Sequence, residues 1–298
     1  VLLAHHLMAH AWAFTRDIDR LLNTVKRTDV SPLGAGALAG SSLPLDPDFT
    51  AREMGFADRF SNSLDAVSDR DFVAEALFDL ALIGTHLSRM GEEWVLWTSE
   101  EFGFATLDDR YATGSSMLPQ KKNADIAELA RGKAGRLIGN LTGLLTTLKG
   151  LPLAYNRDLQ EDKEPLFDSY DQVCLAVSAL TGMINTATFN ADRMRAAADV
   201  QSLAATDLAE YLVRKGVPFR QAHAVVGALV QEALTGSQSL QQLIATSPHF
   251  DADAQQLIGS GVGVQLRSSP GAAGPLAAQD QRTRFGLVIA SLRTSLAI

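Results

Sequence analysis

The sequence predicts an all-α protein in which a bundle of long helices is followed by a small helical domain. Apolar residues recur at helical spacing over several stretches of more than twenty residues, and glycine and proline separate these stretches. No segment between them shows a strand pattern, and consecutive long helices without strands form a bundle. We therefore place a central long-helix bundle, entered part-way, at residues 1–190 and the small helical domain at residues 191–298.

Composition limits the classes of function. The chain has 298 residues and is 46% hydrophobic, which allows a large core and more than one structural unit. Its formal net charge of −8 argues against general binding of nucleic acid or anionic membranes, so local cations would have to hold an anionic ligand. No apolar run approaches the roughly 20 residues of a membrane span. The single cysteine, Cys174, fits a reducing cytoplasm, and we expect it to be buried.

The first expected helix covers residues 1–27, where apolar and charged positions follow the helical period. His6 and His10 are four residues apart, as in a helical metal pair, but no carboxylate or cysteine accompanies them in the pattern of a zinc site. We interpret both as helix-face histidines and predict neither a metal nor a cofactor. Because Val1 is not an initiator methionine and already lies inside the helical pattern, we expect the chain to be the C-terminal part of a longer enzyme.

The next segment combines a connector, a short helix and a long helix. Residues 31–40 are rich in glycine but follow no strand, so they are not a dinucleotide-binding loop. Residues 50–53 match a capping box that would open a short helix at residues 54–56. A helix over residues 69–97 would be roughly 40 Å long. Its middle, near Leu80, is apolar on nearly every side, which implies that other chains cover it.

A loop at residues 113–123, Thr-Gly-Ser-Ser-Met-Leu-Pro-Gln-Lys-Lys-Asn, concentrates polar groups that packing does not require. Gly114 allows unusual backbone geometry and Pro119 stiffens the far side, which predicts a hinged loop. Its hydroxyl, carboxamide and ammonium groups suit an anionic substrate. We expect Asn123 to cap the helix that follows. Further helices are expected at residues 125–148, 166–189, 205–215, 218–234, 240–245 and 276–292, with a loop at residues 259–274.

The loop closely resembles the signature Gly-Ser-Ser-x-Met-Pro-x-Lys-x-Asn of the fumarase, aspartase and argininosuccinate lyase superfamily. Leu118 stands at the position of the signature methionine, an exchange that roughly conserves volume. Residues 128–133, Glu-Leu-Ala-Arg-Gly-Lys, and the block Lys-Gly-Leu-Pro-Leu-Ala-Tyr-Asn-Arg-Asp-Leu-Gln-Glu-Asp-Lys-Glu at residues 149–164 resemble the argininosuccinate lyase branch. The resemblance extends more loosely over the whole chain.

The resemblance implies the elimination of fumarate from argininosuccinate to give arginine. It implies that Ser115 is the catalytic base, that Lys121 stabilises the dianionic intermediate and that Glu128 pairs with a histidine from an upstream Thr-His-x-Gln segment. Acidic residues such as Glu128 are also favoured in the first turn of any helix. The same resemblance implies substrate-binding roles for Ser116, Asn123, Tyr155, Gln160 and Lys163. It also implies a homotetramer whose active sites combine segments of three chains, so we expect the chain alone to be inactive.

Three alternatives stay open. Another fumarate-releasing enzyme, above all adenylosuccinate lyase, would need a purine nucleotide site, and the block at residues 155–164 argues against it. A structural role like that of the lens crystallins related to this family would be compatible with intact site residues. Glu161, Asp162 and Glu164 could bind a cation, but their spacing lacks the converging ligands that hard metal ions need.

Overall fold

The computed structural model describes residues 1–119 and 121–296, so Gln120 of the signature loop lies outside the described residues. Contacts divide the chain into two units: residues 10–189 form the larger unit, and residues 1–9 together with residues 190–298 form the smaller one. Within the described residues, helices account for nearly all regular structure, and each strand is two residues long. The all-α prediction is therefore confirmed. No helix in this part of the chain is long and apolar enough to cross a membrane.

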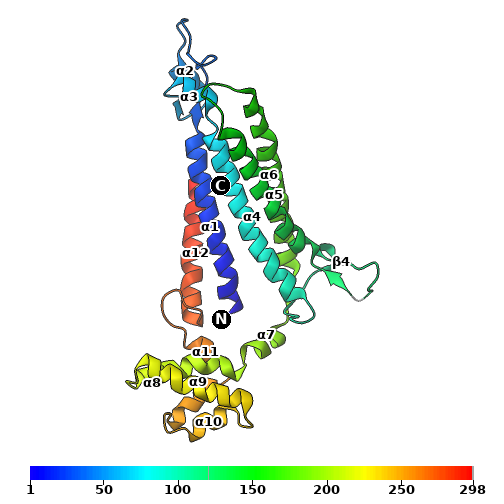
Figure 1. The fold of residues 1–298 in the computed structure, drawn as a ribbon, viewed down its shortest axis with the longest axis vertical. Coiled ribbons are helices and arrows are strands. Elements are labelled where there is room, and N and C mark those ends of the chain that lie inside the picture. Colours follow the sequence, from blue (N-terminus) through cyan, green and yellow to red (C-terminus); the bar gives the residue numbers. More distant parts are fainter. Residues whose placement is uncertain (120, 297–298) are drawn as a thin grey trace. The chain divides into compact units, whose positions relative to one another are not determined.

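Four long helices dominate the larger unit and run beside one another (Figure 1). They match the helices expected over residues 1–27, 69–97, 125–148 and 166–189. Their bounds are α1 (Leu3–Thr28), which enters the larger unit at His10, α4 (Asp71–Thr98), α5 (Asp125–Leu148) and α6 (Lys163–Thr186). Cys174 lies on α6 and is exposed, so the expectation that it is buried is wrong. The helical period of α6 turns Cys174 by about 100° from Val173, away from the core that Val173 and Leu180 face.

Short elements connect these helices. The helix that a capping box predicted at residues 54–56 is instead α2 (Pro47–Glu53). Asp46 accepts a hydrogen bond from the backbone N–H of Phe49, and Pro47 occupies the first helical turn, so this earlier start signal prevails. The other short elements are α3 (Ser63–Ser68), the parallel pair β1 (Val30–Ser31) and β2 (Asp58–Arg59), and the antiparallel pair β3 (Ala105–Thr106) and β6 (Thr188–Phe189).

The core of the larger unit lies between α4, α5 and α6. Leu80 and Ile83 are buried there in one cluster with Leu137 of α5 and Leu180 of α6. Helices α4 and α5 approach closely because Gly84 and Gly91 lie directly against α5. The middle of the long helix is thus covered largely within this chain, although Phe78 is 48% exposed, and the cover that we expect from other chains stays a prediction. A single sequence could not show which helix supplies the cover.

Helices α1 and α4 meet along a seam of polar pairs. Three hydrogen bonds of 2.6 Å join His10 to Glu93, Asp17 to His86, and Thr24 to Asp79. The residue numbers rise by seven along α1 and fall by seven along α4, as expected for two antiparallel helices in one register. Phe14 and Leu21 lie between the polar positions and pack against the core. A shifted register would leave buried polar groups without partners, so the seam specifies the alignment.

The smaller unit has its own core, formed mainly by Leu208, Leu212, Val226 and Ile244. The predicted helices of this region are confirmed with small shifts of their ends. Two short helices, α7 and α11, were not predicted, and α11 falls within the expected loop at residues 259–274. The helices of the region are α7 (Ala191–Ala198), α8 (Ala205–Arg214), α9 (Phe219–Thr235), α10 (Leu240–Thr246), α11 (Val262–Gln265) and α12 (Pro275–Ser295).

Candidate active site

The signature loop is a hairpin whose ends are paired as short antiparallel strands. Strand β4 (Thr113–Gly114) pairs with β5 (Lys122–Asn123). The backbone of Gly114 is not in the left-handed region, so the unusual geometry expected of this glycine is not observed. Asn123 does not cap the next helix: α5 is preceded by Ala124 and has no side-chain cap. That prediction is wrong because strand pairing holds Asn123 two residues before the helix start, one residue before the cap position.

Ser115 occupies the first position after β4 and is half-buried. Its Oγ accepts hydrogen bonds from the backbone N–H groups of Met117, at 3.1 Å, and Leu118, at 3.0 Å. Its own N–H donates to the carbonyl oxygen of Lys121 across the hairpin, at 3.3 Å. Two N–H donors directed at one hydroxyl oxygen stabilise negative charge on that oxygen. This arrangement fits the role of catalytic base that the resemblance implies for Ser115, which stays a prediction.

The two lysines of the loop differ in their partners. The ammonium group of Lys122 pairs with the carboxylate of Asp109. Lys121 is exposed, and within the described residues its ammonium group forms no ion pair, so it is available to a ligand. Ser116 is exposed and Asn123 is half-buried. The structure thus brings Ser115, Ser116, Lys121 and Asn123 together in one hairpin and leaves one of its two ammonium groups uncommitted.

Acidic groups lie beside the hairpin. Hydrogen bonds from the Arg110 side chain and backbone hold the pKa of Asp108 at about 2, so this carboxylate is ionised at neutral pH. Asp108 opens a 3-10 turn at Asp109–Tyr111. The negative charge of Asp108 would repel an anionic ligand that approaches the loop. Nearby cations such as Lys121 would therefore have to bind such a ligand.

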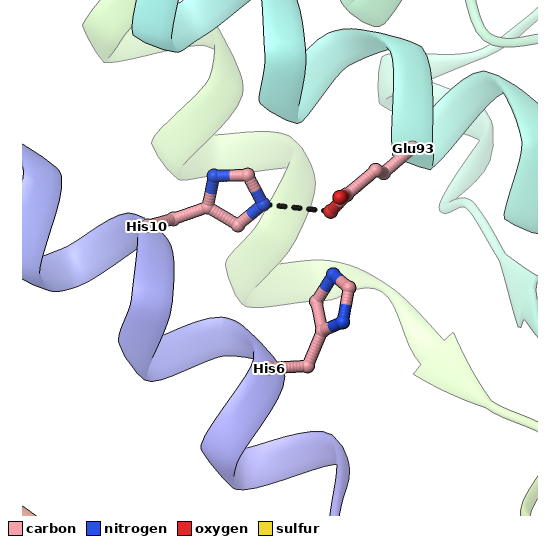
Figure 2. Close-up of side chains that lie close together, drawn as sticks. All are labelled: His6, His10 and Glu93. Carbon is pink, nitrogen blue, oxygen red and sulfur yellow. Dashed lines mark hydrogen bonds and ion pairs between the residues drawn. The ribbon is translucent and has the colours of Figure 1, made fainter. Parts of the chain in front are cut away.

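Glu128 lies in the first turn of α5 and is exposed. One turn further along α5, Arg131 pairs with Glu92 of α4. The adjacent Glu93 accepts a hydrogen bond from Nε2 of His10 at 2.6 Å (Figure 2). A carboxylate from a distant part of the chain therefore accompanies His10, which the local spacing of residues 6 and 10 did not indicate. The pairing of Glu128 with an upstream histidine stays a prediction.

The second block, residues 149–164, forms a tight turn followed by a 3-10 helix, Arg157–Asp162. Ala154 has a φ of 75°, the left-handed region that a residue with a Cβ adopts only at a cost. The Asn156 side chain supports this turn by donating hydrogen bonds to the carbonyl oxygens of Pro152 and Ala154. Next to the turn, Gln160 Nε2 donates a hydrogen bond to the Tyr155 hydroxyl. Two predicted substrate-binding side chains are therefore in contact.

Lys163, the first residue of α6, belongs to a charged triad. Its Nζ donates a hydrogen bond to Asp162 Oδ1 at 2.8 Å, and Arg70 Nε donates to Asp162 Oδ2 at 2.5 Å. Asp162 therefore has two cationic partners, which argues against the cation site considered with Glu161 and Glu164. Sequence analysis missed Arg70. Arg70 stands at the start of α4, where the helix dipole disfavours a cation. An arginine at such a position indicates an acidic partner elsewhere in the protein.

The hairpin and the second block lie at opposite ends of α5 (Figure 1). The hairpin leads into α5 at Asp125, and the block begins after Leu148. At 1.5 Å per residue, the 24 residues of α5 separate the two segments by about 36 Å. A substrate the size of argininosuccinate cannot contact both segments of one chain. The predicted site residues thus form two groups: residues 115–128, and residues 155–163.

Two family models match the chain. The model described as "Lyase" matches residues 1–139, and the model described as "Argininosuccinate lyase C-terminal" matches residues 202–260. The argininosuccinate lyase of Frankia casuarinae is 56% identical over 282 residues, which are 93% of this chain and 61% of that protein. The argininosuccinate lyase of Moorella thermoacetica is 54% identical over 301 residues, covering 99% of this chain and 65% of that protein.

Solved structures of related lyases and of other enzymes with this fold also match the chain. The crystal structure of EDDS lyase in complex with formate matches with a TM-score of 0.89 and 31% identity, covering 98% of this chain and 61% of that one. The 3-carboxy-cis,cis-muconate lactonizing enzyme from Pseudomonas putida matches with a TM-score of 0.68 but only 20% identity, covering 95% and 64%, and supports the fold alone. The chain spans less than two thirds of the length of these relatives. The family models and the curated relatives together show that the chain belongs to the argininosuccinate lyase family.

Proposed function

We propose that the full-length protein is an argininosuccinate lyase, which cleaves argininosuccinate into arginine and fumarate in arginine biosynthesis. The observation that carries this proposal is the geometry at Ser115, whose Oγ accepts hydrogen bonds from two backbone N–H groups in the hairpin that also carries the exposed Lys121. Curated relatives that are 54% and 56% identical to the chain bear the name of this enzyme. The chain's single cysteine agrees with a reducing compartment, and we place the enzyme in the cytoplasm.

In the proposed reaction, the Ser115 alkoxide takes a proton from the carbon next to a substrate carboxylate. The electron pair of that C–H bond is first held on the carboxylate, which becomes a dianion stabilised by Lys121. The pair then forms the double bond of fumarate while the C–N bond breaks. The nitrogen leaves with the electrons of that bond as a neutral guanidine, which takes up a proton to become the guanidinium group of arginine. Ser116 and Asn123 would bind the succinyl carboxylates, and Glu128 would orient a histidine from the segment upstream of this chain.

We infer that each active site is shared between chains. Tyr155, Gln160 and Lys163 would bind the rest of the substrate, yet α5 separates them from Ser115 by about 36 Å in one chain. A site that uses both groups must combine them from different chains. In agreement with the family, we propose a homotetramer. The chain by itself would then lack complete active sites.

The outer face of α5 supports this assembly. Its four glycines lie at spacings of three and four residues, and a Cβ added at any of them would meet nothing within 4 Å; they are Gly132, Gly135, Gly139 and Gly143. Each glycine in a helix interior costs about 1 kcal/mol relative to alanine, and packing within this chain does not require them. Such a stripe allows a second helix to approach closely. Large apolar side chains are also exposed on α5 and on its neighbour α6, including Ile138 and Phe167. Exposed apolar side chains of this size favour contact with another chain.

Replacement of Ser115 by alanine in the full-length enzyme tests the assignment. We expect the rate of fumarate release, followed by absorbance, to fall at least about 100-fold, as is typical when a general base is lost. Ser41→Ala is a matched control, because the Ser41 Oγ also accepts a backbone N–H, from Leu43, in an exposed loop. Adenylosuccinate, malate and aspartate should not be cleaved. Retention of more than about a tenth of the wild-type rate by Ser115→Ala would remove Ser115 as the base.

Mixing two impaired variants tests the shared site. Full-length Ser115→Ala and Lys163→Ala proteins, each strongly impaired alone, should regain partial activity when they are refolded together. Some mixed sites then receive an intact Ser115 from one chain and an intact Lys163 from another. A mixture that regains no activity, although native mass spectrometry detects hetero-oligomers, would contradict shared sites.

A further inference from the structure

Arg70 is held in one orientation by two hydrogen bonds. Its Nε donates to Asp162 Oδ2 at 2.5 Å, and its Nη1 donates to the carbonyl oxygen of Asp69 at 2.6 Å. Its side chain is only 15% exposed and that of Asp162 only 8% exposed. A planar guanidinium group with two fixed contacts has little freedom to rotate. Asp162 is consequently held at one end by a rigid, largely buried cation.

The other oxygen of Asp162 binds Lys163. Oδ1 accepts from Nζ of Lys163 at 2.8 Å, so each carboxylate oxygen has its own cationic partner. The Lys163 side chain is 52% exposed, and an ammonium group has three donors, of which Asp162 uses one. The remaining donors are directed away from Asp162 and are available to an anionic group. The orientation of the ammonium group thus depends on Asp162, and the orientation of Asp162 depends on Arg70.

We propose that Arg70 is a positioning residue, which acts through Asp162 to hold the Lys163 ammonium group ready for a carboxylate of the substrate. This inference rests on the proposed function, in which Lys163 binds argininosuccinate. A free lysine side chain has many rotamers, and ordering it opposes binding. When the protein orders it in advance, that loss is not part of the binding step, and affinity increases. Arg70 should therefore affect substrate binding much more than the chemical step.

A purely structural role for Arg70 makes a different prediction. Arg70 and Asp162 also tie the start of α4 to the start of α6, so loss of either residue could weaken the fold. Replacement of a buried ion pair by apolar residues of similar size often preserves stability, whereas removal of one partner is destabilising. The double variant Arg70→Met/Asp162→Leu removes one positive and one negative charge, so the net charge near Lys163 is unchanged. It removes the anchor of Lys163 without leaving a buried charge unpaired.

The experiment compares this double variant with the wild type in the full-length enzyme. We expect the KM for argininosuccinate to rise about tenfold, which corresponds to ~1.4 kcal/mol of binding free energy. The kcat should stay within about threefold, because the chemistry occurs at Ser115. The KM of Lys163→Ala gives the largest increase in KM that loss of the ammonium group can cause. The melting temperature of each variant reports on the fold.

Arg136→Met/Asp168→Leu is the matched control. Arg136 Nε donates to Asp168 Oδ2 at 2.7 Å and joins α5 to α6, but Asp168 takes its other hydrogen bonds from the side-chain amides of Asn140 and Gln172. The side chains of Arg136 and Asp168 are 56% and 24% exposed, so this control should change the melting temperature no more than the Arg70 double variant does, with an unchanged KM. A KM increase confined to the Arg70 double variant supports the proposal. An unchanged KM in that variant, or an equal rise in the control, overturns it.

Asp162→Asn covers the case in which the double variant fails to fold, since its amide retains the size of the carboxylate but loses the charge that holds Lys163. A raised KM for Asp162→Asn then supports the proposal, and a wild-type KM overturns it. A wild-type enzyme that releases no fumarate from argininosuccinate refutes the proposed function, and the role of Arg70 with it. An active wild type with an unaffected double variant refutes the role of Arg70 alone.

Discussion

A methyl group at Gly91 tests how closely α4 and α5 pack. A Cβ added to Gly91 would lie 2.5 Å from the carbonyl oxygen of Ala127 and 3.5 Å from the backbone nitrogen of Arg131. Both atoms belong to the backbone of α5, which cannot move without the rest of the helix. Gly91→Ala should therefore force the two helices apart at this point and destabilise the larger unit.

The expected loss follows from two opposing effects. An ordinary contact needs about 3.4 Å, so the helices would separate by nearly 1 Å and loosen the packing of Leu87 and Trp94, which are almost completely buried. Overpacking of this kind typically costs 1–3 kcal/mol, and here the clash is with backbone, which favours the upper half of that range. Alanine regains about 1 kcal/mol of helix propensity relative to glycine. We expect a net loss of about 1–2 kcal/mol, or roughly 2–8 °C in melting temperature.

Gly84→Ala is the matched control on the same helix. A Cβ at Gly84 would meet the Cδ1 atom of Leu137, the far end of a side chain that can change rotamer, and its nearest backbone neighbour is Ala134 Cα at 3.6 Å. The gain in helix propensity is the same, so we expect a net change within about 1 kcal/mol. Thermal unfolding followed by circular dichroism, at one protomer concentration, compares the two variants. The reasoning is refuted if Gly91→Ala is as stable as Gly84→Ala.

Single positions elsewhere in the chain give three further predictions. Burial raises the pKa of the Asp79 carboxyl group, so the ionised carboxylate lowers the free energy of unfolding at pH values above the ordinary pKa of an aspartate. In urea titrations, Asp79→Asn should therefore be more stable than wild type at pH 7, and the difference should close below about pH 4. A difference that does not vary with pH would contradict this. Ala154→Gly should relieve the left-handed backbone and stabilise the protein by roughly 0.5–1 kcal/mol, and a lower melting temperature would argue against strain. Gly139→Ala should weaken self-association of the full-length protein in sedimentation experiments, and unchanged association would argue against a close helix contact there.

The positions of the long helices were predictable because their signals are local. The apolar period and the glycine and proline residues around it placed a helix at residues 125–148, and α5 has these bounds. Short elements were less predictable, because neighbouring start signals compete. The Asp46-Pro47 start prevailed over the capping box at residues 50–53. The residue types of the signature loop predict an anionic ligand from the sequence alone, and that stays a prediction.

Tertiary structure decided which distant residues meet. Arg70 and Asp162 are 92 residues apart, and His10 and Glu93 are 83 apart, so their pairing depends on how antiparallel helices align in three dimensions. Local patterns carry no information about that alignment. The sequence by itself determined the helical class, the family resemblance and the candidate residues. Only the structure showed the packing of whole helices that brings Arg70 to Asp162 and Glu93 to His10, because that packing depends on side chains far apart in the sequence.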